Sequence, residues 1–332
     1  MRILTTLLAL AVSFGLASTA SAAEICGNGI DEDSNGSTDT GCWPAGVTKV
    51  CENPMSCKVT GDIAPKSGGI VYQVPLPDID PKVPYGPSLQ FRRTYQSLFA
   101  NSGLANYRKS MGNRWHHSFQ GWLDKSGTTV VVHLTTGQDV LFTYSATVGG
   151  YDYYTPQAGY HFKHLRQATS SPNNWDLKTL TGETFVYNWA SPTGKLIEIQ
   201  DPLANKVTIT YFTSGGNAGQ IDHIDDASGK KRITFLYNNA NIVEARYQTV
   251  SGGTPTIRVT AQWTYTNANP LTFKLGGVVV QTMTYTSNYL TLIEDGGGND
   301  IISLAYVAAN LGQTARVTTG EGGIGYGACQ RF

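Results

Sequence analysis

The sequence predicts an all-β protein, built as an elongated or spiralling antiparallel sheet of stacked hairpins. Composition, strand-like alternation and internal repetition predict this fold class. Charged residues make up only 14% of the 332 residues, whereas the chain has 37 Gly, 18 Tyr and 6 Trp. This balance is typical of many short strands joined by tight turns. The 24 acidic and 24 basic side chains cancel, which argues against binding to nucleic acid through bulk charge.

The first 22 residues have the pattern of a secretory signal peptide. Arg2 supplies a positive end, Ile3–Ala17 an apolar stretch, and Ala20–Ala22 a small-residue cleavage site. We therefore expect a mature chain that begins at Ala23 and is secreted or held at the surface of a bacterium. No later segment has the roughly 20 apolar residues of a membrane helix.

The cysteines predict a disulfide-stapled region at the mature N-terminus. Export permits disulfides, and four of the five cysteines lie close together in the sequence. We favour pairing Cys26 with Cys42 and Cys51 with Cys57, although four cysteines allow three connectivities. Cys329, near the other end, has no predicted partner.

Between Cys26 and Cys42 the chain carries side-chain oxygens at alternating positions, a spacing that suits Ca²⁺. This cation takes about 6 to 8 oxygen ligands, and Gly36 allows the sharp turn that gathers them. The predicted ligands are the side chains of Asp31, Asp33, Asn35 and Asp39 and the backbone carbonyl of Ser37. Cys42 stands where an EF-hand has a bidentate Glu, so we expect modest affinity. The alternative is an acidic, solvated linker tied by a disulfide.

This segment also resembles a metal-binding motif of secreted bacterial proteins, C-G-N-G-x-D-x-D-x-(D/N)-G-x-x-D. In that motif a disulfide closes the acidic loop. Ser34 stands where the family often has another Cys. The resemblance implies the same role, a cation loop, that the spacing predicts.

Strand signals begin after a Pro- and Gly-rich stretch. Residues from about Trp43 to Gly86 are expected to be extended or irregular, because closely spaced prolines exclude a long helix. From Leu89 onward, short alternating runs predict strands with one buried face, as in Val207–Tyr211. Gly-containing turn signals separate these runs and predict hairpins.

The chain also repeats itself. Gly194–Tyr211 aligns with Gly219–Tyr237, and a more degenerate copy runs over Tyr289–Tyr306. Tyr187 precedes the first copy at a similar spacing. A period of about 20 to 50 residues is the signature of units that cannot bury a core alone. The repeats therefore predict successive strand–turn–strand units.

These repeats resemble the YD-repeat family, whose unit reads G-R-(L)-x-x-(I/V)-x-D-x-x-G-x-x-(hydrophobic)-x-(aromatic)-x-Y-D. The Tyr is kept here. The Asp after it is replaced by Phe212 and Asn238, and the Arg after the leading Gly by Lys195 and Gln220. The chain therefore resembles degenerate copies of the YD repeat.

Two earlier motifs resemble the N-terminal domain of rearrangement-hotspot (RHS) proteins. Gly86–Ser97 resembles their G-x-x-L-x-x-x-R-x-Y-x-S entry strand, and Gly112–Phe119 their G-x-G-W-x-H-S-(F/Y) segment. The resemblance covers about Gly61 to Thr319. It divides the chain into a signal peptide (1–22), a disulfide-stapled cation-binding loop region and linker (23–60), an RHS N-terminal β-domain (61–186), degenerate YD repeats (187–319) and an irregular tail (320–332).

In RHS proteins the repeats form a spiralling sheet around a cavity, often with a C-terminal toxin. The resemblance implies a partial, polymorphic-toxin-related shell. The chain lacks the further repeats and the D-P-x-G autocleavage core, so we do not expect it to enclose cargo alone.

We expect a non-enzymatic scaffold or binding protein. The expected partner is a further RHS/YD-repeat chain, or a second copy, paired through the C-terminal strand edge. Glycan is another expected ligand, whereas nucleic acid and a membrane span are not expected. The alternatives are a glycan-binding surface adhesin that uses exposed Tyr and Trp, or a carbohydrate-active enzyme. No G-x-S-x-G, H-E-x-x-H, P-loop or paired-Cys zinc pattern occurs, so an enzyme has no predicted catalytic residue.

The histidines are expected to be structural. His116 and His117 point to opposite faces of a strand, so they do not easily join one site. His161 and His164 have a spacing that binds metal on a helix, but their neighbours predict a strand.

Arginines and repeat aspartates are expected to be structural too. Arg92, Arg93 and Arg114 are expected to pair with acidic neighbours such as Asp124 or to stack on Tyr. The repeat aspartates are expected to cap turns; they are Asp201, Asp226 and Asp295.

Overall fold

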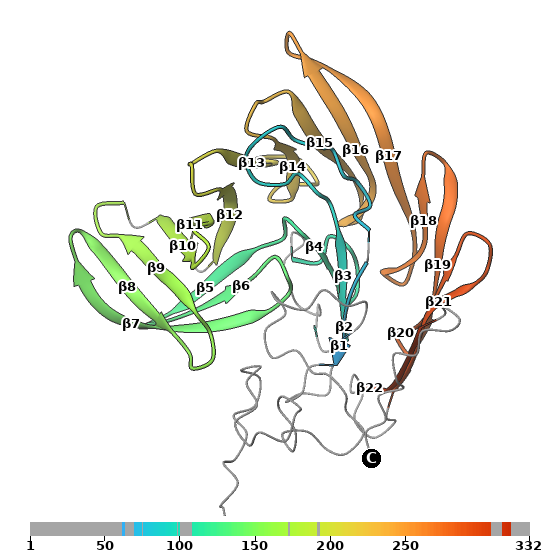
Figure 1. Cartoon of the computed structure of the whole chain (residues 1–332), viewed down its shortest axis with the longest axis horizontal. Helices are drawn as coiled ribbons and strands as arrows, with labels where there is room; N and C mark the ends of the chain where they lie inside the picture. The colour runs from blue at the N-terminus through green and yellow to red at the C-terminus, as the bar shows by residue number, and fades with distance from the viewer. Residues whose placement is uncertain are drawn as a thin grey trace, which may run out of the picture. The chain divides into compact units, whose positions relative to one another are not determined.

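The computed structural model describes residues 62–63, 70–74, 76–97, 99, 108–171, 173–190, 193–306 and 314–319. By its contacts the chain divides into residues 1–45 and 46–332, and all the described residues belong to the second unit. Within them the chain is all-β and antiparallel, with strands stacked in chain order (Figure 1). The predicted fold class is therefore confirmed. The described residues contain no helix long and apolar enough to span a membrane.

A small sheet comes first. It has the order β1–β2–β3–β4 and consists of β1 (Asp62–Ile63), β2 (Ile70–Gln73), β3 (Arg93–Gln96) and β4 (Trp115–His117). Most of β3 and all of β4 are buried, including Arg93, His116 and His117. Both faces of these strands are therefore covered by other parts of the chain.

The next strands close into a ring. They are β5 (Trp122–Ser126), β6 (Thr129–His133), β7 (Asp139–Val148), β8 (Tyr151–Pro156), β9 (Phe162–Ala168), β10 (Asn174–Thr179), β11 (Thr184–Ala190) and β12 (Thr193–Gln200). Each pairs with the next, and β12 returns to pair with β5. Closure removes the exposed edges that an open sheet would have at β5.

Strand β12 is also where the sheet branches. Its first residues, Thr193–Lys195, pair with β5, whereas Glu198–Gln200 pair with β13. Between these halves, Ile197 is an extra residue in the pairing with β11. A β-bulge of this kind bends a strand and increases its twist. The bulge therefore lets one strand both close the ring and start a second array.

The second array continues to the last described strand. It consists of β13 (Lys206–Tyr211), β14 (Ile221–Asp225), β15 (Lys231–Asn238), β16 (Asn241–Ser251), β17 (Thr254–Thr266), β18 (Asn269–Leu275), β19 (Val278–Thr286), β20 (Tyr289–Asp295), β21 (Asp300–Tyr306) and β22 (Thr314–Thr319). The three predicted repeats are strand–turn–strand units, formed by β12–β13, β14–β15 and β20–β21. The predicted boundary between the β-domain of residues 61–186 and the repeats of residues 187–319 lies inside β11, where the sheet continues without a break.

The repeat aspartates cap turns, as predicted. Asp201 Oδ1 accepts the backbone N–H of Leu203 and of Asn205, both at 2.9 Å. Asp295 repeats this arrangement with Gly297 and Asn299. Asp226 Oδ1 accepts the backbone N–H of Lys230 and of Lys231, both at 3.0 Å. The asparagine side chains that also bond Asp201 and Asp295 lower the pKa of both carboxyls.

Residues 78–121, in the part that the structure describes, pack against one face of the second array. We call them the inner segment and that face the inner face. The ring of Phe91 lies 5.4 Å from that of Phe235 and 5.7 Å from that of Trp263. In Figure 1 the strands of the inner segment, β3 and β4, lie between the ring and the later strands. The core of the second array is thus completed by a segment that precedes it in the chain.

Candidate functional site

Four tyrosines make the same contact along the inner face, and we call these contacts the tyrosine ladder. In each, the hydroxyl donates to a backbone carbonyl on the strand before it. The pairs are Tyr211 with Leu196 (2.7 Å), Tyr237 with Ile221 (2.8 Å), Tyr265 with Ile242 (2.7 Å) and Tyr306 with Leu290 (2.7 Å). Each tyrosine therefore ties one strand pair to the pair before it.

The accepting residue always stands in the same place. It is the residue that pairs with the preceding tyrosine of the series, and a bulge follows it. These pairs are Tyr187 with Leu196, Tyr211 with Ile221, Tyr237 with Ile242 and Tyr285 with Leu290. A bulge interrupts the regular hydrogen-bond pattern, so the backbone groups beside it need partners from elsewhere.

The inner segment supplies the matching acceptors. The backbone N–H of Leu196 donates to the Gly121 carbonyl at 3.1 Å, and that of Ile242 to the Ser110 carbonyl at 2.7 Å. The N–H of Leu290 donates to the Tyr95 hydroxyl at 3.1 Å.

At the equivalent position of β18, paired with Tyr265, stands Pro270. Proline has no N–H, so this position needs no acceptor. The tyrosine ladder and the inner segment thus jointly satisfy the backbone at Leu196, Ile242 and Leu290.

Two tyrosines of the series depart from the pattern. Tyr285 accepts a hydrogen bond from Trp115 Nε1 at 2.9 Å. Tyr187, the first of the series, is fully buried, and its hydroxyl has no hydrogen-bond partner among the described residues. Burial raises the pKa of the Tyr187 hydroxyl. This contrast provides a matched pair of substitutions.

Tyr237→Phe is expected to lower the free energy of unfolding by about 1 kcal/mol, because the Ile221 carbonyl loses its donor. Tyr187→Phe removes a hydroxyl without a partner, so stability is expected to stay the same or rise. Urea denaturation of both variants measures the difference. Equal losses in the two would show that the ladder contact adds nothing to stability.

A buried ion pair within the inner segment packs against the second array. Arg93 Nε donates to Asp78 Oδ2 at 2.6 Å, and Nη2 donates to Asp78 Oδ1 at 3.0 Å and to Gln281 Oε1 at 2.8 Å. The two charged side chains are 0% and 1% exposed. The guanidinium carbon lies 4.6 Å from the ring centre of Phe273 and 5.9 Å from that of Trp263. Arg93 therefore contacts β17, β18 and β19 from β3.

Burial lowers and the Asp78 carboxylate raises the pKa of the Arg93 guanidinium, with a net upward shift. Burial also raises the pKa of Asp78, and Arg93 lowers it, with a net upward shift. We infer an ionised pair, because two short hydrogen bonds join the groups and Arg is in effect always protonated.

A second polar cluster lies where the ring closes. Asp124 of β5 accepts both Nη groups of Arg108, at 2.9 and 2.6 Å, and the Thr193 hydroxyl of β12 at 2.7 Å. His133 Nε2 lies 3.3 Å from Asp124, and its Nδ1 lies 2.6 Å from Asp139. Burial raises the pKa of Asp124, but the hydrogen bonds from His133, Arg108 and Thr193 lower it more. The cluster ties β5, β6 and β12 together at the closure.

Two of the arginines behave as expected. Arg93 pairs with an acidic residue, Asp78, and Arg114 lies over the ring of Tyr289 at 4.0 Å, as expected for stacking on Tyr. Asp124, the example given of an acidic partner, pairs with Arg108, which the closure brings to it in space.

His116 and His117 are both buried, and they lie in different environments, as predicted for neighbours on a strand. The ring of His117 lies 4.9 Å from that of Phe91. The ring of His116 packs against Gly137, where an added Cβ would lie 2.1 Å from it. Burial lowers the pKa of His116 to about 4 and of His117 to about 3. The fold therefore holds both in the neutral form.

This predicts a loss of stability in mild acid. The unfolded chain binds these protons below about pH 6.5, whereas the folded chain binds them only near the lowered pKa values. Stability is full above pH 6.5 and falls as pH drops toward 4, by up to about 1.4 kcal/mol per pH unit and histidine. Denaturation midpoints from pH 7 to 4.5 measure the slope. His117→Gln is expected to flatten it. Equal slopes in the unsubstituted protein and this variant would contradict the prediction.

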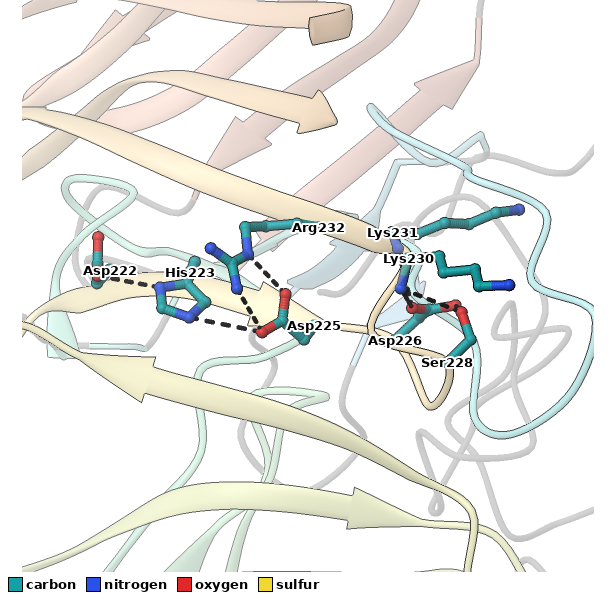
Figure 2. Close-up of polar contacts among 8 residues, drawn as sticks. All are labelled: Asp222, His223, Asp225, Asp226, Ser228, Lys230, Lys231 and Arg232. Carbon is teal, nitrogen blue, oxygen red and sulfur yellow. Dashed lines mark hydrogen bonds and ion pairs between the residues drawn. The ribbon is translucent and has the colours of Figure 1, made fainter. Parts of the chain in front are cut away.

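A third polar cluster lies on β14 and β15. Figure 2 shows His223 between two carboxylates, with Nδ1 3.0 Å from Asp222 and Nε2 3.5 Å from Asp225. Arg232 donates to both oxygens of Asp225, at 2.6 and 2.8 Å. In the described part of the chain no group of three or more His, Cys, Asp or Glu could hold a metal ion. Asp225 and Arg232 face each other on paired strands, so we interpret this cluster as charge pairing.

The other predicted site residues have these outcomes. The cation ligands Asp31, Asp33, Asn35, Ser37 and Asp39 lie outside the described residues, as do the five cysteines. His164 lies on β9, a strand as expected, and its Nε2 contacts Asp176 at 2.8 Å.

Sequence analysis missed Tyr265 and Tyr285 as members of the series. A signal for them exists, because Tyr237, Tyr265 and Tyr285 are each followed, after one residue, by a tight turn of Asn, Ala or Ser. Those turn residues have positive φ, which hairpin turns of this type require.

Comparison with known proteins places one match within the described fold. The model of a domain of unknown function, DUF6531, matches residues 63–142, from the first sheet to the start of β7. No curated protein matches the chain. Among solved structures, a porin-like protein from Bacteroides uniformis ATCC 8492 is similar at 13% identity and a TM-score of 0.21, covering 59% of this chain and 85% of that one. A likeness this weak supports no inference about function.

Proposed function

We propose that the chain is a non-enzymatic scaffold or binding protein of RHS type, secreted or held at the bacterial surface. The tyrosine ladder is the observation that carries this proposal. It joins strand–turn–strand units by one repeated contact, as a structural array requires. The buried and half-buried polar side chains support the same role, since Arg93 pairs with Asp78 and Arg108 pairs with Asp124. The resemblance of the sequence to RHS and YD repeats supports the same proposal.

The test compares association with turnover. Light scattering of the full chain over a wide concentration range is expected to show association, and a glycan panel incubated with it is expected to release no reducing sugar. Release of reducing sugar above a heat-denatured control would overturn the proposal in favour of a carbohydrate-active enzyme.

A second candidate, a glycan-binding adhesin, is favoured by exposed tyrosines. Tyr85 is 51% exposed and Tyr144 41% exposed. Glycan-array binding that is lost in Tyr85→Ala and Tyr144→Ala, and kept in the exposed-leucine control Leu203→Ala, would favour the adhesin. Binding that persists in both tyrosine variants would count against it.

We also propose a Ca²⁺ site of modest affinity in the N-terminal loop, with Asp31, Asp33, Asn35, Ser37 and Asp39 as ligands. The support is the alternation of oxygen ligands in the sequence. Calorimetry is expected to show Ca²⁺ binding that the double substitution of Asp31→Ala and Asp33→Ala abolishes. Asp80→Ala, an exposed carboxylate elsewhere, serves as the control. An unchanged isotherm in the double variant would exclude this site.

A further inference from the structure

The tyrosine series has a next position on β22. Tyr306 of β21 pairs with Thr314, and a bulge follows, because Ala305 pairs with Arg316. Thr314 therefore stands in the register position that Leu196, Ile221 and Leu290 occupy beside earlier tyrosines. By its register, Thr314 at the start of β22 occupies the position whose backbone carbonyl accepts a tyrosine hydroxyl in the ladder.

Each earlier position shows what such a residue requires. Its carbonyl accepts a tyrosine hydroxyl from the following strand in four cases, at 2.7 to 2.8 Å. Tyr285 of β19, which instead accepts from Trp115, is the exception in the series. Among the described strands, β22 pairs with β21 alone. The tyrosine that would follow Thr314 is therefore supplied by no described strand.

We infer that β22 is a docking edge for a strand–turn–strand partner that carries a tyrosine, whose hydroxyl donates to the Thr314 carbonyl. This inference rests on the proposed scaffold function and names the chemistry of the partner. Strand addition gives affinity through backbone hydrogen bonds, and side chains at defined positions give specificity. Here the tyrosine would fix the register, because a slip of one residue moves it to the other face of the sheet.

The partner is not a second β22. The sequence of β22, Thr314–Thr319, contains no tyrosine, so two such edges paired with each other would lack the contact. The partner sought has alternating apolar residues that end in Tyr, one further residue and a tight turn, as Tyr237 and Tyr265 do. We choose this partner because the same tyrosine contact recurs four times along the array, not because of exposed apolar area.

The experiment uses the full chain and a labelled synthetic peptide of residues 231–251, which spans β15 and β16 and contains Tyr237. A matched peptide carries Tyr237→Phe. Fluorescence anisotropy is expected to show about fivefold weaker binding of the Phe peptide, the effect of one hydrogen bond. Hydrogen–deuterium exchange of the full chain is expected to show protection at 314–319 with the Tyr peptide.

Equal affinities of the two peptides, protection only outside 314–319, or no binding of either peptide would each overturn the inference. None of these results touches the scaffold proposal, which fails on a different measurement, the release of reducing sugar. Conversely, release of reducing sugar together with binding of the Tyr peptide at β22 would overturn the scaffold proposal and leave the docking inference standing.

Discussion

Asp78→Ala is expected to lower the free energy of unfolding by about 3 to 5 kcal/mol, because it leaves a buried guanidinium without its counter-ion. Arg93 is 0% exposed, and its remaining acceptors are the neutral Gln281 side chain and Met283 Sδ. Among the described residues Asp78 is the carboxylate paired with Arg93. The aromatic rings around the guanidinium attract it before and after the substitution, so they do not offset the loss. The loss of the carboxylate therefore dominates.

Urea denaturation of the full chain measures this loss, with two companions. Asp80→Ala removes an exposed carboxylate that pairs with Lys82 at 2.6 Å, and is expected to cost less than about 1 kcal/mol. The double variant Asp78→Leu and Arg93→Met removes both buried charges, and is expected to recover most of the stability. If Asp78→Ala costs no more than Asp80→Ala, the buried ion pair does not stabilise the fold.

The sequence predicted what depends on local chemistry. Alternation of apolar residues identifies Val207–Tyr211 as a strand because the period of a strand is two residues. The turn-capping role of Asp201 and Asp295 follows from a side chain that reaches the backbone two to four residues later. The same logic explains why the histidines next to Trp115 lie in different environments. Each of these inferences needs only a few neighbouring residues.

Long-range contacts could not be predicted in this way. The acceptor Gln281 lies 188 residues from Arg93, and nothing near either residue indicates the contact. The return of β12 to β5 is of the same kind, since a bulge at Ile197 decides which strand each half of β12 meets. Tyr265 was missed because the hairpin of β16 and β17 is longer than its neighbours, which breaks the spacing. The predicted cation ligands lie outside the described residues, so their prediction stays open.

Gly112→Ala is expected to destabilise the fold by about 3 kcal/mol, because the added Cβ would meet both an unfavourable backbone conformation and a steric clash. Gly112 has φ of +87°, and a Cβ there would lie 2.3 Å from the backbone oxygen of Ala268. The left-handed conformation costs an L-residue about 1 to 2 kcal/mol, and an overpacked contact costs about 1 to 3 kcal/mol more. The Ala268 oxygen cannot move aside easily, because it accepts the N–H of Asn113 at 2.7 Å.

Gly127→Ala is the matched control for this substitution. Its φ of +57° carries the same kind of conformational cost, but nothing lies within 4 Å of the added Cβ. The difference between the two variants, measured by thermal or urea denaturation, therefore isolates the close approach of the inner segment to the β17–β18 turn. A large difference means that the Gly112–Phe119 segment is held by the array it precedes. Equal losses would mean that the inner segment can leave the inner face at little cost in free energy. The tyrosine ladder would then have to be stable without the inner segment.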